Sequence, residues 1–303
     1  MNAPVVSLSG ATVSSAPLAP GEQPVPHATP LIYLSDRRVI FIGHLPAARR
    51  TSLASSRLIL CLAGEMHYRL ADDGPLQACT SLLLPPGLSI AVDTRKALIA
   101  DCFLEVLGRD HASLRQHAME LAPGLYRDIP QQEELAFLLR QLHREAPSAA
   151  VFFERLEPLL EAGAATSAFI VDARIERIVE RIKRSPRESL PLEVLASEVG
   201  LSPSRLLALF KAKVGVPIRR YRLWRRLYQS TLRLSAGGSL TEAAMEAGFA
   251  DSPHFSRTYR DMIGMQPSTL TRNECGLRIF VDQRPLEANP QPLTQKGENP
   301  QVD

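Results

Sequence analysis

Cysteine is scarce in this 303-residue chain and is not arranged for cross-linking or metal binding. The four cysteines are scattered, with no CxxC pair and no histidine at ligand spacing (Cys61, Cys79, Cys102 and Cys275). This pattern argues against a disulfide framework and a zinc site, and it fits reduced thiols in a cytoplasm. We therefore expect no cofactor and no metal.

Long hydrophobic runs are also lacking. The longest, such as residues 58–63, fall far short of the roughly 20 residues needed to span a bilayer. No basic-then-apolar leader opens the chain, so we expect a cytoplasmic protein with no membrane partner. The length suits two domains rather than one, and 45% hydrophobic residues are ample for two cores.

Positive charge is concentrated in one part of the chain. Residues 168–275 hold 18 Lys and Arg against 11 Asp and Glu, or +7, whereas the remainder holds 17 against 21, or −4. A charge excess is often only a solvated face. Here five arginines crowd one predicted helix, and a polyanion is the better interpretation (Arg219, Arg220, Arg222, Arg225 and Arg226).

The segment Ser239 to Leu270 has the pattern of two short helices joined by a glycine turn. An apolar-periodic run ends at Gly248, which suits a left-handed helix cap. Asp251 or Ser252 can then cap a second helix that carries apolar residues at helical spacing. Any αα-hairpin shares these features, so a single copy leaves a purely structural role open.

The residues off the apolar face of that second helix are Ser252, Ser256, Arg257 and Arg260. Short polar and arginine side chains are what a helix-turn-helix presents to base edges and phosphates. Arg257 is the best candidate for a bidentate contact to guanine or phosphate. We expect His254 to lie at the hydrophobic junction instead.

A second copy of the pattern lies roughly 48 residues upstream, in residues 192–217. Ala196 matches Ala244, Gly200 matches Gly248, and Gly215 matches Gly264. The intervening residues 218–234 contain no glycine or proline and predict one helix that holds the two hairpins at a fixed separation.

The paired hairpins, with the string AGFxDxxHFSRxYRxxxGxxP, resemble the DNA-binding domain of AraC/XylS transcriptional regulators over residues 170–272. The resemblance implies that two recognition helices enter adjacent major grooves of double-stranded DNA. The family's base-facing positions in the first helix are here Ser204, Leu207 and Ala208, which offer thymine-methyl contact or weak specificity. Arg205 and Lys211 remain available for phosphates.

The segment 31–107 contains brief β-favouring runs separated by turn residues, which predict a small antiparallel barrel or sandwich. Its punctuation at Gly64, Gly74 and 85–87 looks like the cupin-type barrel that many AraC-family regulators use for sensing. Enzymatic cupins hold metal with two His and a Glu, and the corresponding segment offers only His67. No effector-binding residue can be named from the sequence.

Helices are predicted at 110–117, 131–144, 151–162 and 172–184. A leucine stripe on the second of these predicts either core packing or the dimer contact that the resembling family makes with such helices (Leu135, Leu138, Leu139 and Leu142). Six prolines in residues 1–30 predict a disordered arm, and a polar, Pro-rich composition predicts a flexible tail over 276–303.

The predicted architecture is an α+β chain with two domains: a cupin-like sensing and dimerisation domain (31–165), and an all-α double helix-turn-helix domain (168–275). We expect a non-enzymatic homodimeric transcription regulator, controlled by a small-molecule effector and acting on RNA polymerase at a promoter. The alternatives are a regulator whose barrel only dimerises, a cupin-type enzyme, or an alkyl-transfer repair protein fused to a DNA-binding module. The effector, the target genes and activation versus repression cannot be read from the sequence.

Overall fold

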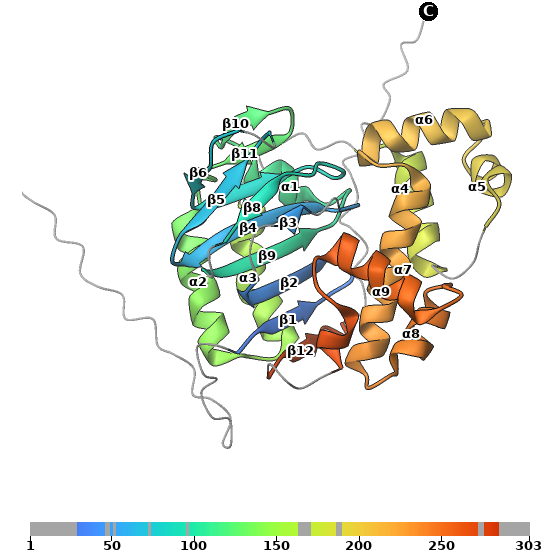
Figure 1. The fold of residues 1–303 in the computed structure, drawn as a ribbon. Coiled ribbons are helices and arrows are strands. Elements are labelled where there is room, and N and C mark those ends of the chain that lie inside the picture. The colour runs from blue at the N-terminus through green and yellow to red at the C-terminus, as the bar shows by residue number, and fades with distance from the viewer. Residues whose placement is uncertain are drawn as a thin grey trace, which may run out of the picture.

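The computed structural model describes residues 29–45, 49–50, 53–71, 74–94, 97–162, 171–185, 190–271 and 276–284. A strand-rich N-terminal domain packs against a C-terminal group of helices (Figure 1). The expected arm lies outside the described residues except for its last two positions. The α+β architecture with two domains agrees with the prediction.

The N-terminal domain contains two hydrogen-bonded sheets. The larger has eight strands in the order β10-β11-β7-β4-β9-β2-β1-β12, and the smaller has four in the order β3-β8-β5-β6. The strands are β1 Leu31–Leu34, β2 Arg38–His44, β3 Arg49–Arg50, β4 Ser56–Ala63, β5 Met66–Arg69, β6 Gln77–Cys79, β7 Ser81–Leu84, β8 Ala91–Asp93, β9 Leu98–Leu104, β10 Met119–Ala122, β11 Leu125–Arg127 and β12 Arg278–Val281. Among the described strands, no hydrogen-bonded ladder joins the two sheets into a closed barrel. The strands of the domain form two packed sheets.

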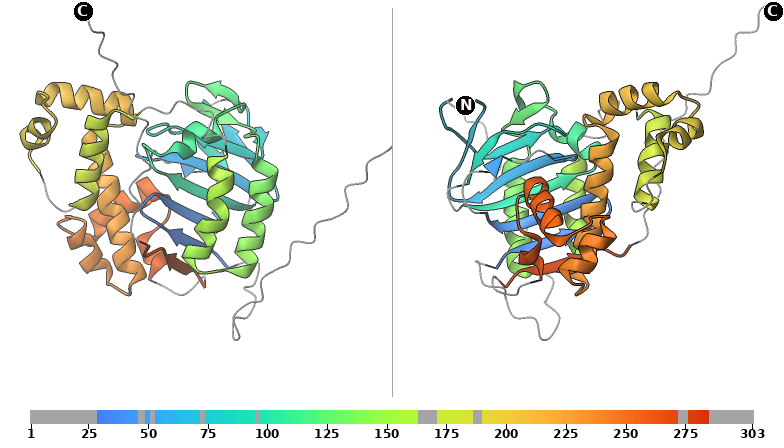
Figure 2. Two further views of the ribbon diagram at one scale, coloured as in Figure 1. Left: turned by 180° about the vertical axis from the view of Figure 1, so that it is seen from behind. Right: turned by 45° about the vertical axis from the view of Figure 1, so that its right-hand side comes forward.

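The two faces of the large sheet are covered by different layers. Because side chains alternate along a strand, Leu31 and Tyr33 of β1 face the helices behind the sheet, whereas Ile32 and Leu34 face the C-terminal helices. The small sheet covers the β7–β4–β9 end of that second face through a cluster that includes Ile59. The C-terminal helices therefore complete a layer that the small sheet leaves open over β1 and β2 (Figure 2).

Helices α1 (Arg109–Leu114), α2 (Gln132–Glu145) and α3 (Ala149–Glu161) cover the other face, close to the predicted spans. The leucine stripe of α2 is buried against the sheet: Leu135, Leu139 and Leu142 are at most 1% exposed, and Leu138 packs at their margin. Of the two roles predicted for this stripe, core packing is confirmed, and the dimer contact does not apply to these leucines because the sheet of the same chain already covers them.

Buried charge fixes the helices to the sheet. Arg38 of β2 is 2% exposed and donates two hydrogen bonds to Asp110 at 2.7 and 2.8 Å. It also reaches Glu157 and Glu161 of α3 at 2.9 Å. Removing one partner of such a buried pair typically destabilises a fold by about 3–5 kcal/mol.

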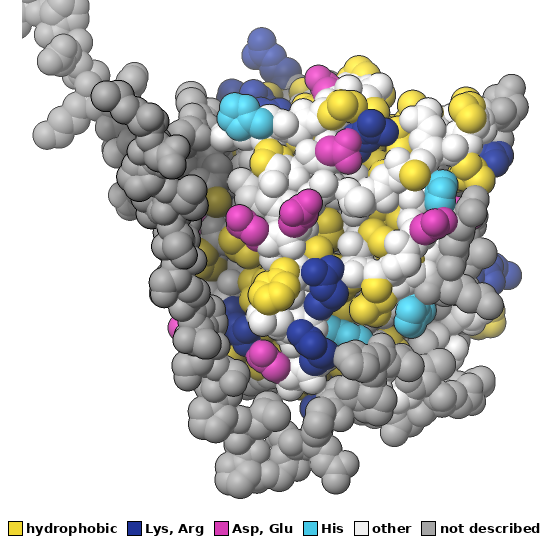
Figure 3. All heavy atoms as spheres, turned by 90° about the vertical axis from the view of Figure 1, so that its left-hand side faces the viewer, with side chains coloured by type: hydrophobic (Ala, Val, Ile, Leu, Met, Phe, Trp, Pro, Cys, Tyr) yellow, Lys and Arg dark blue, Asp and Glu magenta, His cyan; other side chains and the backbone are white. Residues whose placement is uncertain are grey.

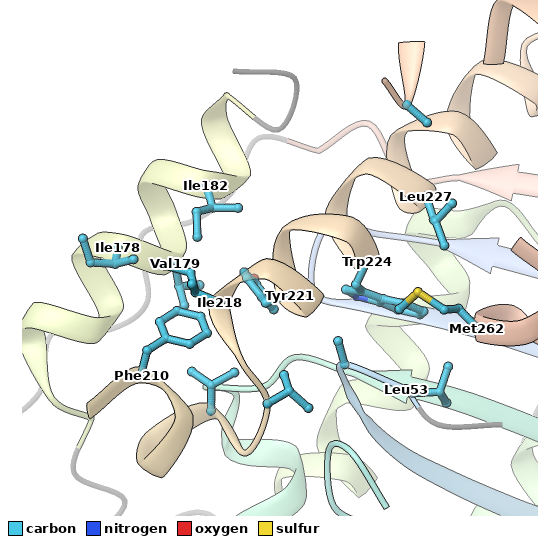
Figure 4. Close-up of a cluster of buried hydrophobic side chains, with 14 of the residues drawn as sticks. Leu53, Ile178, Val179, Ile182, Phe210, Ile218, Tyr221, Trp224, Leu227 and Met262 are labelled. Atoms are coloured by element: carbon cyan, nitrogen blue, oxygen red, sulfur yellow. The ribbon is translucent and has the colours of Figure 1, made fainter. Parts of the chain in front are cut away.

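The C-terminal helices are α4 (Ala173–Arg184), α5 (Leu192–Glu198), α6 (Pro203–Val214), α7 (Ile218–Ser235), α8 (Leu240–Glu246) and α9 (Ser252–Ile263), followed by a short 3-10 turn, Pro267–Leu270. Their core is shared with the first domain. Leu53 of the N-terminal domain joins the same cluster as Trp224 and Met262 (Figure 4). Phe103 of the N-terminal domain also belongs to this cluster. The helical domain is thus not packed as a self-contained unit.

The expected flexible tail is wrong for its first residues. β12 pairs in parallel with β1 at the edge of the large sheet, with Arg278 opposite Leu31 and Val281 opposite Leu34. Phe280 stacks on Tyr33 with ring centroids 4.7 Å apart. The chain therefore returns to the N-terminal sheet after leaving the helices, and residues 285–303 lie outside the described part.

Candidate nucleic-acid interface

The second hairpin is built by local capping. Ser239 and Glu242 form a complete capping box at the start of α8, and Gly248 (φ 72°) makes the turn. Asp251 caps α9 by accepting the His254 N–H at 2.6 Å, and Gly264 (φ 89°) ends that helix. The sequence predicted the glycine turn between the two helices, and of the two cap candidates, Asp251 and Ser252, the structure uses Asp251.

The apolar face of α9 fixes which side points outward. Phe255 and Tyr259 are at most 1% exposed, and the Tyr259 hydroxyl lies 2.8 Å from that of Thr231 on α7. His254 is exposed, but its ring packs edge-on against Phe249 at 5.1 Å between centroids. His254 therefore contacts the hydrophobic junction, as expected, but its side chain is not buried there.

The predicted DNA-facing residues of α9 lie on its outer side. Arg257 and Arg260 are exposed, whereas Ser252 and Ser256 are half-buried. Arg260 lies within 3.9 Å of the neighbouring Asp261, and Arg257 makes no ion pair with any described residue. Arg257 is therefore free to donate its parallel N–H groups to an incoming acceptor.

The first hairpin repeats this scaffold with a different surface. Ser202 caps α6, Gly200 (φ 65°) makes the turn and Gly215 (φ 85°) ends the helix. Leu206 and Phe210 are fully buried, as the repeat predicted. The five residues assigned to DNA on this helix are all exposed, with Leu207 at 41% (Ser204, Arg205, Leu207, Ala208 and Lys211).

Helix α7 connects the two hairpins and contacts both. Two of its arginines are directed at them. Arg222 donates to the Leu190 carbonyl before α5 at 2.7 Å, and Arg226 packs over the Phe249 ring of the second hairpin at 6.0 Å. These contacts hold the hairpins to their common support.

Arg225 corrects the expectation that every arginine of this helix serves a polyanion. It is 3% exposed, donates to Asp36 of the N-terminal domain and lies 4.7 Å from the Tyr228 ring. Burial in the domain interface prevents it from reaching DNA. No local pattern in the sequence marked it, because its partner lies 189 residues away.

Four residues, Asp36, Glu105, Lys183 and Arg225, form an interdomain ion cluster. Lys183 of α4 lies 2.7 Å from Glu105 and 3.0 Å from Asp36. Burial alone would raise the pKa of Asp36, but Arg225 and Lys183 outweigh it and lower that pKa. Burial likewise opposes the charge on Lys183, and Glu105 and Asp36 reverse this and raise its pKa.

Two small adjoining cavities lie at this interface. One is polar, includes Asp36 and Arg225 and has a volume of about 20 Å³. The other is apolar, includes Leu34 and Met265 and has a volume of about 30 Å³. Trp224, the single tryptophan of the chain, lines both.

The N-terminal sandwich itself is filled. Ten buried hydrophobic side chains, Tyr68 among them, occupy the space between its sheets. Arg57 is paired with Asp101 at 2.7 Å, and the Tyr68 hydroxyl donates to Gln77. Within the described ranges, no group of three His, Cys, Asp or Glu side chains could hold a metal, and no helix is long and apolar enough to cross a membrane.

The face of the N-terminal domain turned away from helices α4–α9 differs from a DNA-binding surface. Its Lys and Arg side chains are interspersed with Asp and Glu, and hydrophobic side chains lie between them (Figure 3). The hairpin side of the molecule carries the exposed cations described above.

Comparison with known proteins gives the same picture for the C-terminal region. Residues 195–273 match a helix-turn-helix domain family. A XylDLEGF operon transcriptional activator of Pseudomonas putida is 34% identical over 101 residues, which are 32% of this chain and 30% of that protein. The bifunctional transcriptional activator and DNA repair enzyme Ada of Escherichia coli is 34% identical over 96 residues, or 30% of this chain and 26% of Ada.

The chain thus spans less than a third of the length of these curated relatives. An apo form of ToxT from Vibrio cholerae superposes with a TM-score of 0.51 at 13% identity, covering 78% of this chain and 97% of that one. The likeness to ToxT extends over both domains and concerns the fold alone. The C-terminal region is an AraC-type helix-turn-helix domain, as its sequence motifs predicted.

Proposed function

We propose that the protein is a transcription regulator that binds promoter DNA with both hairpins and transmits the result to RNA polymerase. The observation that carries this proposal is the repeated hairpin scaffold, which leaves Arg257 exposed on one recognition helix and Lys211 exposed on the other. The XylDLEGF operon activator and Ada are both named as transcriptional activators, which favours activation.

Binding to duplex DNA tests this function directly. Fluorescence anisotropy of the full chain with labelled duplex should give an affinity that falls by orders of magnitude between about 50 and 200 mM salt, because phosphate contacts release counterions. Arg257→Ala should weaken binding in the same assay. An affinity indifferent to salt would rule out this function.

The effector site of this regulator lies, in our proposal, at the domain interface rather than inside the sandwich. The sandwich interior is filled by side chains, whereas the interface holds the two adjoining cavities. Each cavity can hold only one or two water molecules, so an effector that binds there must break contacts between the two domains. That opening would link effector binding to the hairpins.

Trp224 provides the readout for this site. A metabolite bound at the interface should change the fluorescence of this single tryptophan and raise the melting temperature, since a ligand at 100 times its dissociation constant adds about 2.7 kcal/mol. A ligand bound elsewhere would raise the melting temperature alone. A regulator with no effector is the second candidate, favoured by the filled sandwich, and it predicts neither change for any metabolite.

Homodimerisation is the remaining part of the proposal. Because the leucine stripe is buried, the contact must use other residues, and Phe137 of α2 and Val151 of α3 are 55% and 41% exposed. Sedimentation of the full chain should show a dimer that Phe137→Glu dissociates. A parent chain that stays monomeric at micromolar concentration, with and without DNA, would contradict it.

A further inference from the structure

The N-terminal domain contacts both hairpins at the same position of the repeat. That position is the glycine-ended turn after each recognition helix, Gly215-Val216 in the first copy and Gly264-Met265 in the second. One contact comes from a loop and the other from the face of the large sheet. The two equivalent points are therefore held by one domain.

The first contact is made by the loop after β7. A Cβ placed on Gly87 would lie 3.1 Å from Cγ1 of Val216, and a Cβ placed on Gly215 would lie 3.3 Å from Cβ of Pro86. Val216 is 2% exposed. The loop and the end of α6 thus touch closely, and a side chain on either glycine would crowd the contact.

The second contact is made by β1 and β2. Ile263 and Met265, at the end of α9, face Leu34 and Phe41 across the apolar cavity. Leu34 is fully buried, and Met265 packs against the same cluster of side chains. The end of the second recognition helix therefore rests on the N-terminal sheet.

We propose that the N-terminal domain is a brace that fixes the separation and tilt of the two recognition helices, with Pro86 and Leu34 as positioning residues for DNA binding. Without a brace, the first hairpin is held by α4 and α7 and the second mainly by α7, and each can tilt about that junction. A tilt that moves a side chain by an ångström disrupts a bidentate contact to a base, because hydrogen bonds weaken steeply with distance and angle.

The interdomain ion cluster strengthens this brace between its two ends. Lys183 and Arg225 connect α4 and α7 to Asp36 and Glu105, and Phe103 packs against Trp224 with ring centroids 5.6 Å apart. Both hairpins and their connecting helix are thus attached to the N-terminal domain. A change in that domain would alter the distance between the two DNA contacts.

Selection of preferred sites from random duplexes tests the brace in the full chain. Leu34→Ala is compared with Leu31→Ala, because both leucines are fully buried in β1 but Leu31 faces α3. Pro86→Gly is compared with Pro85→Gly, since Pro85 contacts Gly124 within its own domain. Glycine removes the Cβ of Pro86 that meets Gly215, which alanine would keep. If Leu34→Ala does not fold, the comparison of the Pro86 and Pro85 variants tests the brace instead.

Loss of the brace should broaden the spacing that the protein tolerates between its two half-sites by about one base pair or more. Affinity for a single half-site should stay at the parental value, which a general loss of stability would not allow. The inference is overturned if Leu34→Ala and Pro86→Gly keep the parental spacing, if the control variants broaden it equally, or if loosening raises affinity at unchanged spacing.

The inference rests on the proposed binding of both hairpins to one duplex. The proposed function and the brace would be contradicted by different outcomes of this experiment. A parent chain that selects no sites contradicts the proposed function, whereas a parent that selects paired sites with a spacing insensitive to Leu34 and Pro86 contradicts only the brace.

Discussion

The two hairpins have the same scaffold but different surfaces. Gly200 and Gly248 make equivalent left-handed turns, and Phe210 and Tyr259 fill equivalent buried positions. Their outer faces differ in part: Leu207 and Ala208 occupy the positions of Ser256 and Arg257, whereas Lys211 corresponds to Arg260.

The comparison shows that the two copies share their buried positions and differ at exposed ones. Buried positions are constrained by close packing, so a change of volume is costly. Exposed positions on the recognition helices carry no such constraint and can differ in chemistry. We therefore propose that the first hairpin positions the protein on phosphates and methyl groups and that the second selects bases.

The most severe test of the common scaffold is truncation of its equivalent core residues. Phe210→Ala and Tyr259→Ala should each lower the free energy of unfolding by about 3–5 kcal/mol, because both side chains are at most 1% exposed. Urea denaturation of the full chain measures this. A loss below about 1 kcal/mol in one hairpin alone would contradict the structural equivalence.

Truncation of the two outer faces should give unequal results. Arg257→Ala should cost about 1–3 kcal/mol on the selected site and relax preference at one or two base pairs. Leu207→Ala should weaken binding only modestly and leave stability unchanged, since its side chain is 41% exposed. If Leu207→Ala abolishes sequence preference while Arg257→Ala retains it, the assignment of the second hairpin as the selective one is wrong.

The helix caps give a smaller contrast. Asp251 accepts the His254 N–H at 2.6 Å, whereas Ser202 accepts the Arg205 N–H at 3.4 Å. Asp251→Ala should therefore lower the free energy of unfolding by about 1 kcal/mol, and Ser202→Ala by less. Thermal unfolding of the two variants compares them, and equal losses would show that cap geometry does not distinguish the hairpins.

The smallest effect concerns phosphate contact by the first hairpin. Lys211→Ala should reduce the slope of log affinity against log salt by about 0.9 without changing the selected sequence. Arg174→Ala serves as control, because Arg174 is exposed on α4, where it pairs with Asp172. A slope that is unchanged in Lys211→Ala would remove this residue from the DNA interface.

The helices and turns of the hairpins follow from local signals, and the sequence predicted them well. Helical periodicity, caps and glycines act within a few residues, so α8, α9 and their repeat were predictable. The burial of Arg225 and the pairing of β12 with β1 were not, because both depend on partners far away in the chain. The direction of the α2 leucine stripe also required knowing which surface covers it.

The edge of the large sheet has a consequence for the order in which the chain can fold. Leu31 pairs with Arg278, 247 residues later in the sequence. At a synthesis rate of roughly 5–20 residues per second, β1 waits on the order of tens of seconds for its outer neighbour. During that interval the outer edge of β1, which is paired only with β2 on its other side, is open to other nascent chains, and such edges promote aggregation. Among the described residues, the last strand thus covers the edge of the first, and chains that end before residue 278 never gain that protection.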